Sequence, residues 1–206
     1  MSVSVVYILT NEAMPDYIKI GVTDDLRRRM KELYGSGVPL PYQCYYAAEV
    51  ADKRDVEKRL HRAFDDYRKN KGREFFFQLD PHKVQTILEM IAIREVTPKE
   101  DVFFEPDDKK ALERVSRSGR RFSFSSVDIP IGATLNFVQD ESITSIVHSD
   151  TSVLYEGQEL SISKAALLAT HACGYKSSTA AGPWYWLFKG ETLNTLRSLA
   201  EDRVEE

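Results

Sequence analysis

The chain has 206 residues, of which 42% are hydrophobic and 29% are charged, and its formal net charge at pH 7 is −4. This balance is typical of a globular protein, excludes a wholly disordered chain and allows one or two domains. The sequence has no run of about 18 apolar residues, which excludes a transmembrane helix. Residues 1–9 lack the basic start of a signal peptide. The two cysteines, Cys44 and Cys173, have neither disulfide-framework nor zinc-site spacing, so we expect a cytoplasmic protein.

The positive charge is concentrated in the first half of the chain. Residues 53–73 hold nine Lys or Arg against four Asp or Glu, whereas residues 120–206 hold seven against eleven. A second basic cluster comprises Arg27, Arg28, Arg29 and Lys31. A local basic surface on a mildly acidic protein is compatible with phosphate binding.

The first 95 residues predict a small antiparallel sheet flanked by helices. Runs rich in β-branched and aromatic residues predict strands, and amphipathic runs that follow Thr or Asp predict helices. The predicted strands are residues 3–9, 17–22 and 42–50, with 75–79 as a strand or buried turn. The predicted helices are residues 25–34, capped by Thr23 or Asp24, residues 52–68, capped by Asp52, and residues 81–94. The first two strands are expected to form a hairpin.

The rest of the chain predicts a linker and a second small α+β domain. Residues 96–120 are charged and interrupted by prolines, which predicts a linker with one helical segment at 109–116. The predicted strands of the second domain are 135–138, 142–148, 152–155 and 184–188, and its predicted helices are 164–172, capped by Ser163, and 191–202. The predicted organisation is therefore two domains, 1–95 and 121–206, joined by the linker 96–120.

The first domain contains an ordered set of motifs. VYIL is followed by YIKIG, then by a basic helix, and then by Glu57 on the next helix. This order resembles the GIY-YIG nuclease family over residues 3–80, with Tyr7 and Gly21 at the tyrosine and glycine of its two strand motifs. The resemblance implies that Arg29, eight residues after Gly21, is the catalytic arginine, and that Glu57 binds the metal ion.

One position departs from the family pattern. The second motif of the family has a tyrosine two residues before its glycine, and this chain has Lys19 there. The KIG form, with Glu57, His61 and the later GREFF, resembles the phage-associated branch of the family. Tyr17 lies on the same face of the predicted strand as Lys19. Either Tyr17 partly replaces the missing tyrosine, or Lys19 itself contacts the phosphate.

These residue types suit phosphodiester cleavage. Mg²⁺, or Mn²⁺, held by Glu57 would act as a Lewis acid, and Arg29 can pair bidentately with phosphate oxygens. Tyr7 or Tyr17 would orient or deprotonate the attacking water. Deprotonation requires a nearby cation, because the ordinary pKa of tyrosine is about 10. His61, with an ordinary pKa near 6.5, is the alternative base.

The basic clusters supply the residues that we expect to contact DNA. They are Arg27, Arg28, Lys31, Arg54, Lys58, Arg62 and Arg68. Two of these, Arg54 and Arg68, share one edge of the second predicted helix with Glu57 and His61. Glu74, in GREFF, is expected to be a turn residue or the ion-pair partner of an arginine.

The second domain resembles the restriction-enzyme and adenine-methylase-associated (RAMA) domain. The resemblance rests on Gly157 after a hairpin, an Ala-rich helix ended by Gly174, and the aromatic run that follows Gly182. It implies a role in reading modified DNA. Alternation along a strand would place Trp184 and Trp186 on one face, either as core or as an aromatic pocket for a flipped base. Ser178 is a candidate hydrogen-bonding group beside that pocket.

Three hypotheses follow for the function. The first is a metal-dependent DNA endonuclease of restriction or phage defence, directed by its second domain, with modified DNA as the candidate target. The second, favoured by Lys19, is a non-catalytic DNA-binding adaptor on a degenerate nuclease fold. The third is a regulatory partner in a restriction or methylation complex. A double-strand cut from one active site per chain requires a homodimer or two successive nicks, and the sequence leaves both open.

Overall fold

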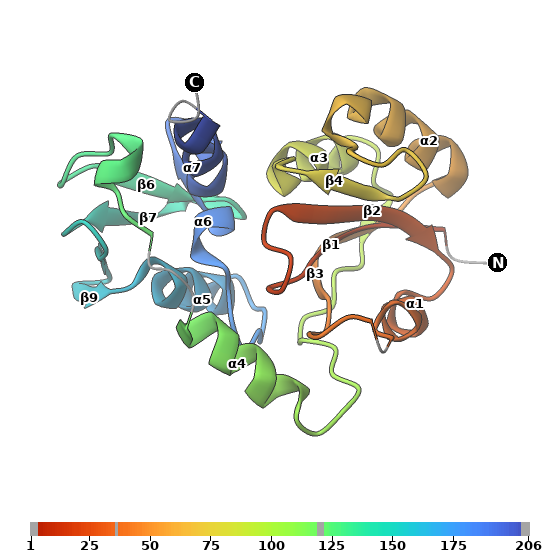
Figure 1. Ribbon diagram of the computed structural model, residues 1–206, viewed down its shortest axis with the longest axis horizontal. Helices are drawn as coiled ribbons and strands as arrows, with labels where there is room; N and C mark the ends of the chain where they lie inside the picture. Colours follow the sequence, from red (N-terminus) through yellow and green to blue (C-terminus); the bar gives the residue numbers. More distant parts are fainter. Residues whose placement is uncertain (1–3, 36, 119–121, 203–206) are drawn as a thin grey trace. The chain divides into compact units, whose positions relative to one another are not determined.

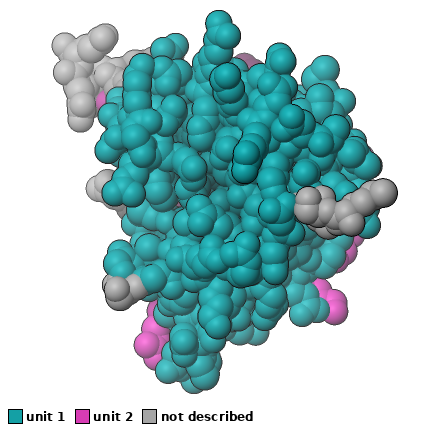
Figure 2. Space-filling model, turned by 90° about the vertical axis from the view of Figure 1, so that its right-hand side faces the viewer, with its two compact units in different colours: residues 1–112 teal, residues 113–206 magenta. Residues whose placement is uncertain are grey.

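The computed structural model describes residues 4–35, 37–118 and 122–202 (Figure 1). The chain divides into two compact units, residues 1–112 (unit 1) and 113–206 (unit 2), which Figure 2 colours separately. Each unit holds one antiparallel sheet with helices beside it, so the predicted α+β class is confirmed. Val3, the start of the first predicted strand, and residues 119–121, where the predicted linker ends, lie outside the described residues. None of the helices in the described part of the chain has the length and apolar character needed to cross a membrane.

Unit 1 contains a five-stranded sheet in the order β4-β2-β1-β3-β5. Its strands are β1 (Val5–Thr10), β2 (Tyr17–Thr23), β3 (Gln43–Glu49), β4 (Phe75–Phe77) and β5 (Arg94–Glu95). The predicted hairpin of β1 and β2 is confirmed, with Tyr7 opposite Gly21. The third predicted helix is too long, because it ends at Glu89 and residues 94–95 pair with β3 instead. Two residues are too few to show a strand pattern in the sequence.

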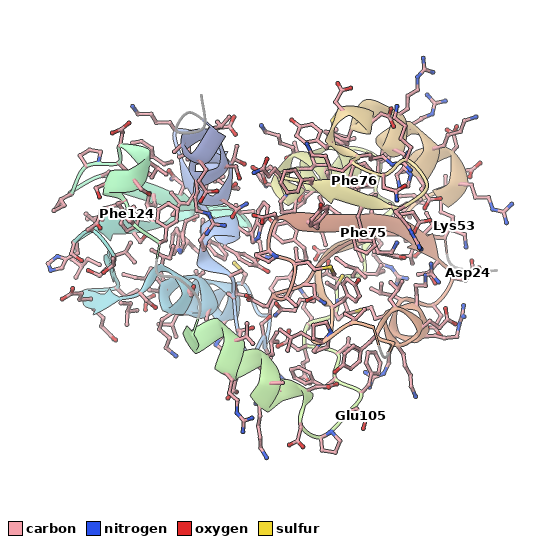
Figure 3. The ribbon with its side chains drawn as sticks, in the orientation of Figure 1. Asp24, Lys53, Phe75, Phe76, Glu105 and Phe124 are labelled. Carbon is pink, nitrogen blue, oxygen red and sulfur yellow. The ribbon has the colours of Figure 1, made fainter. Side chains whose placement is uncertain are left out.

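Helices cover both faces of this sheet. They are α1 (Leu26–Leu33) on one face, and α2 (Lys53–Ala63) and α3 (Pro81–Glu89) on the other (Figure 1). Successive strand residues point to opposite faces, as Phe75 and Phe76 show (Figure 3). Phe75 packs against the buried cluster that contains Tyr7 of β1 and Met30 of α1. Phe76 is fully buried and meets the ring of His61 of α2 edge-on.

Aspartate caps begin the helices that carry the site residues. Asp52 caps α2 as predicted, but α1 is capped by Asp25 rather than by Thr23 or Asp24. The Thr23 hydroxyl instead accepts a hydrogen bond from the Asp25 N–H (3.0 Å), which fixes the chain entering the helix. The predicted helix 52–68 is also too long, because α2 ends at Ala63 and a 3₁₀ turn, η1 (Asp65–Tyr67), follows.

Part of the predicted linker, residues 96–120, is built into unit 1. The Val96 N–H donates to the Ala47 carbonyl (2.8 Å), and the Thr97 hydroxyl accepts the Ala47 N–H (3.0 Å). Val102 is buried in the cluster beneath β1. Helix α4 (Asp108–Ser118) follows and contains the predicted helical segment 109–116. A linker is therefore wrong for residues 96–102, where a few spaced apolar residues pack without any periodic pattern.

Unit 2 contains a six-stranded sheet in the order β11-β10-β6-β7-β8-β9. Its strands are β6 (Thr134–Phe137), β7 (Asp140–Val147), β8 (Val153–Tyr155), β9 (Gln158–Leu160), β10 (Trp186–Phe188) and β11 (Glu191–Thr192). Its helical segments are η2 (Ser125–Val127), α5 (Ile162–Ala172), α6 (Gly182–Tyr185) and α7 (Leu193–Asp202). Ser161 caps α5 in place of the predicted Ser163, and Gly174, at φ +85°, follows its end.

Both tryptophans belong to the core of unit 2. Trp186 is fully buried, and its indole Nε1 donates to the Ile162 carbonyl (3.1 Å). Trp184 is 4% exposed and lies in α6, because Pro183 favours a helical first turn. The prediction that the two rings share a strand face is therefore wrong, and burial removes both from an exposed base-stacking pocket. Ser178 lies half-buried in the segment before α6.

The substitution Gly182→Ala tests this packing. A Cβ at Gly182 would lie 2.6 Å from the carbonyl carbon of Ile162 and from the backbone nitrogen of Ser163. Backbone cannot give way as a side chain can, so we expect a loss of about 1–3 kcal/mol in the stability of unit 2. Both tryptophans lie in unit 2, so tryptophan fluorescence during denaturation reports on this unit. Gly35→Ala, whose Cβ would meet no atom within 4 Å, is the control; equal transitions for the two variants would contradict the packing.

Candidate active site

The site is built around the close approach of Tyr7 to Gly21. A Cβ at Gly21 would lie 2.5 Å from the Tyr7 hydroxyl oxygen and 2.8 Å from Cζ, so the phenol ring occupies the space that a side chain would need. In this position the Tyr7 hydroxyl accepts a hydrogen bond from Arg29 Nε (3.3 Å). The contact joins β1 and β2 to α1, and it brings together the three residues that the first two motifs and the basic helix predict.

Burial determines the protonation state of Tyr7. The side chain is fully buried, and desolvation raises the pKa of Tyr7 although the Arg29 guanidinium opposes the shift. The phenol is therefore neutral at physiological pH. A tyrosine base requires a nearby cation that lowers its pKa, and Arg29 is such a cation. Burial raises the pKa of Tyr7 by more than Arg29 lowers it, so Tyr7 is not suited to act as a base.

The positive charge of Lys19 is paired with a carboxylate within the protein. Its side chain is buried, and Nζ lies 2.5 Å from Oε2 of Glu74 and over the ring of Phe75, 5.0 Å from the ring centroid. Burial opposes ionisation of Glu74, but the hydrogen bond and charge of Lys19 outweigh it and lower the pKa of that carboxyl group. Glu74 thus has a lysine partner where an arginine was expected, and Lys19 does not offer a free charge to a phosphate.

Tyr17 lies away from this centre. Its ring packs on Phe77 of β4, with ring centroids 5.2 Å apart. Tyr17 precedes Gly21 by four residues on β2, which at about 3.3 Å per residue separates their backbones by roughly 13 Å. Tyr17 shares the face of Lys19, as predicted, but its contacts give no support to the hypothesis that it replaces the missing tyrosine.

Helix α2 brings Glu57 and His61 to the site, one turn apart. Glu57 is half-buried, and it makes no hydrogen bond or ion pair with any other residue that the structure describes. Burial and the neighbouring charge of Glu74 raise the pKa of Glu57, while Lys19 and Arg29 lower it less. A half-buried carboxylate without a partner among the described residues is available to bind a cation.

One ring nitrogen of His61 is hydrogen-bonded, and the other has no partner among the residues that the structure describes. Its Nε2 lies 3.1 Å from the carbonyl oxygen of Ile20. Since a carbonyl oxygen only accepts hydrogen bonds, Nε2 carries the proton and Nδ1 is the basic nitrogen of the neutral ring. Burial lowers the pKa of His61, so the neutral form is present at physiological pH. The imidazole is therefore suited to accept a proton at Nδ1.

An ion pair links the beginnings of the two helices that carry the site residues. Lys53, at the start of α2, pairs with Asp24 in the turn before α1 (Figure 3). The Lys53 side chain is only 16% exposed, so this pair is partly shielded from solvent. It ties the beginning of the helix that carries Glu57 to the beginning of the helix that carries Arg29.

A pocket of about 700 Å³ opens beside Glu57 and His61. Its lining comes from α2 and η1 on one side and from the turn that precedes β4 on the other. The lining residues are Glu57, Lys58, His61, Arg62, Asp65, Arg68, Lys71, Gly72, Arg73 and Glu74. A carboxylate, an imidazole and several cations thus face one open volume, which suits a phosphate-containing ligand.

The predicted DNA-contacting residues divide into two groups. Lys58, Arg62 and Arg68 line the pocket, whereas Arg27, Arg28, Lys31 and Arg54 do not. Arg28 is paired with Glu32 on its own helix. The prediction omitted Lys71 and Arg73, although the NKGR run at residues 70–73 has the composition of a turn that could carry charges to the site.

The donor set fits a magnesium-type ion. Among the described residues, no group of three or more His, Cys, Asp or Glu side chains could hold a metal by themselves. Mg²⁺, however, is commonly held by one or two carboxylates, with water and substrate phosphate completing its shell. Glu57 has a carboxylate that pairs with no group in the described part of the chain, while the Glu74 carboxylate beside it is engaged by Lys19.

Comparison with known families agrees with this geometry. Residues 4–92 match the T5orf172 domain, a phage-associated nuclease-like domain consistent with a GIY-YIG-like superfamily at a coarse level. The match runs from β1 to the end of α3 and therefore contains Tyr7, Arg29, Glu57 and His61. It does not reach unit 2, for which the resemblance to RAMA domains stays a prediction. No curated protein and no solved structure matches the chain.

The substitution Gly21→Ala tests the Tyr7 contact. The fully buried ring has no free space to enter, so we expect a loss of about 1–3 kcal/mol in stability and displacement of the phenol from Arg29. In a Tyr7→Leu background the same glycine substitution should cost less, because the clashing hydroxyl and ring are absent. Chemical denaturation followed by far-ultraviolet circular dichroism measures both effects. An equal cost in the two backgrounds would show that the clash is not what makes glycine necessary.

Proposed function

We propose that the chain is a metal-dependent endonuclease that hydrolyses phosphodiester bonds in DNA. The observation that carries this proposal is one pocket lined by a half-buried carboxylate and a neutral imidazole nitrogen, neither with a partner among the described residues, and by several cations. The match of residues 4–92 to a nuclease-like domain supports the same reading. A role in restriction or phage defence, with modified DNA as target, is part of the proposal and rests on the resemblances of the sequence.

Glu57 is the proposed ligand of Mg²⁺ or Mn²⁺. When bound there, such an ion would supply Lewis-acid activation of the phosphoryl oxygen. Arg29, whose side chain is 35% exposed, would offer its guanidinium to the charge that develops on the phosphate. Because Tyr7 is fully buried and contacts the Arg29 guanidinium, we assign it as the residue that positions Arg29.

His61 is the proposed general base. In a water-mediated cleavage, Nδ1 of His61 would accept the proton of the attacking water while Nε2 keeps its hydrogen bond to the Ile20 carbonyl. The backbone bond fixes the tautomer and the orientation of the ring. A neutral imidazole can take this role at neutral pH, whereas the Tyr7 phenol cannot.

Glu57→Gln separates cleavage from binding. The amide keeps the size of the side chain but is a poor magnesium ligand, so we expect cleavage of plasmid DNA to fall by at least about 100-fold. Binding measured in EDTA should persist, because the cations of the pocket remain. Asp55→Asn, the same charge change at an exposed position of the same helix, should retain cleavage. Wild-type cleavage that survives EDTA, or an active Glu57→Gln variant, would contradict the metal-dependent mechanism.

The same assay on unmodified and cytosine-modified phage DNA tests the finer part of the proposal. Metal-dependent cutting confined to modified DNA would support modification-directed restriction. Cutting of every substrate would keep the nuclease and remove the modification requirement.

The pH dependence of cleavage identifies the base. Burial lowers the pKa of His61 from 6.5, so a His61 base becomes active as the pH rises through values below 6.5. The rate at saturating metal should therefore rise in the acidic range and be level at neutral pH. His61→Gln retains a donor for the Ile20 carbonyl but no base, and should lose most of the rate. A rate that continues to rise above about pH 10 would instead point to Tyr7, whose pKa is raised.

A DNA-binding adaptor is the second candidate function. The observation that favours it is the charge of Lys19, which occupies a motif position of tyrosine and is neutralised by Glu74. An adaptor would bind DNA with a strong salt dependence and would cut no substrate in the presence of either metal.

A further inference from the structure

The segment between η1 and β4 forms a well-defined turn, residues 69–73. The Arg73 N–H donates to the Asn70 carbonyl (3.0 Å), and the Gly72 N–H donates to Oδ1 of Asn70 (2.9 Å). Lys69 lies over the ring of Phe77, with its Nζ 5.0 Å from the ring centroid. The backbone of the 69–73 turn is thus set by its own hydrogen bonds at the edge of the pocket.

The side chain of Arg68 holds this turn through hydrogen bonds to its backbone carbonyls. Its Nη2 donates to the carbonyl oxygens of Lys71 and Arg73, the latter at 3.0 Å, and its Nε lies 3.3 Å from the Arg73 oxygen. Asp65 pairs with Arg68 (3.5 Å) and with Lys71 (2.6 Å). The Arg68 side chain is only 14% exposed. The predicted role of Arg68 as a phosphate contact is therefore replaced by a role in shaping the turn.

Three pocket cations are left without an internal partner. Lys58, Arg62 and Arg73 are exposed, and their side chains form no ion pair or hydrogen bond within the described part of the chain. Arg59, on the same helix, is by contrast paired with Asp55 (2.7 Å). Lys58 and Arg62 are four residues apart, and like charges at this spacing weaken a helix. Stability of the fold therefore does not account for this arrangement.

We propose that Lys58, Arg62 and Arg73 form a phosphate clamp that binds the DNA backbone beside the bond to be cleaved. Helix α2 contributes two of the cations, and the 69–73 turn contributes the third across the pocket. Arg68 is the positioning residue of the clamp, since it holds the carbonyl of the residue that carries the third cation. The position beside a scissile bond rests on the function proposed above. The phosphate-binding role rests only on the three cations that are unpaired among the described residues and on the contacts of Arg68 that shape the turn.

The clamp is tested by the salt dependence of binding. Affinity of the full chain for a fluorescent DNA duplex is measured by anisotropy in EDTA, between about 50 and 200 mM salt. Arg62→Ala and Arg73→Ala should each raise Kd about fivefold and reduce the slope of log Kd against log salt by about 0.9, which corresponds to one phosphate contact. Arg59→Ala removes the same charge from the outer face of α2 and should change neither quantity.

Arg68→Lys tests the positioning role. Lysine keeps the charge but cannot form the planar fork that spans two carbonyl oxygens. We expect Arg68→Lys to weaken binding about as much as Arg73→Ala, and to add little when the two are combined. At saturating DNA and Mg²⁺, kcat should stay within about threefold of the wild-type value. A general structural defect would instead weaken binding independently of Arg73 and lower kcat as well.

The outcomes separate this inference from the function on which part of it rests. If Arg62→Ala and Arg73→Ala bind DNA as Arg59→Ala does, the clamp is wrong, even where the wild-type chain cuts DNA. If both reduce the salt slope but the wild-type chain cuts nothing, the clamp stands as the surface of an adaptor and the endonuclease proposal is wrong. Additive effects of Arg68→Lys and Arg73→Ala would overturn the positioning role alone.

Discussion

The packing of the Tyr7 ring against Gly21 is the constraint from which the rest of unit 1 follows. It requires the register that places these two residues opposite each other, and a shift by one residue would turn every side chain of β2 to the other face. In this register Lys19 faces the same side as Tyr7 and can reach Glu74, while Ile18 and Ile20 are buried on the opposite face.

The charges of unit 1 fall into those that the protein neutralises and those that it leaves open. Lys19 and Glu74 form an ion pair, and the guanidinium of Arg68 donates hydrogen bonds to backbone carbonyls. Glu57, by contrast, has a raised pKa and no hydrogen-bonding partner among the described residues, which is an unfavourable state for a half-buried carboxylate. A bound cation would relieve that cost. The paired charges therefore stabilise the fold, whereas the carboxylate of Glu57 is left to bind a ligand.

Local patterns in the sequence were sufficient for the hairpin, for the Asp52 cap and for the grouping of Glu57 with His61, because each depends on neighbours within one turn or one strand. Contacts distant in sequence were not accessible. The Lys19–Glu74 pair joins residues 55 positions apart, and Val102 returns to the core of unit 1 without any periodic pattern. The strand position predicted for Trp184 is wrong because a single helical turn before β10 interrupts an aromatic run that has the composition of a strand.

The lysine of the KIG motif gains a physical meaning from its partner. Glu74 directly follows the 69–73 turn, its backbone oxygen accepts the Ile20 N–H (3.3 Å), and its carboxylate pairs with Lys19. Lys19 therefore anchors the end of the turn to β2, while Arg68 holds its interior carbonyls. A tyrosine at position 19 could donate a hydrogen bond to Glu74, but it could not supply the positive charge that helps to lower the pKa of this carboxyl group against the effect of burial. The lysine at position 19 and the shape of the basic turn are in this way two parts of one arrangement.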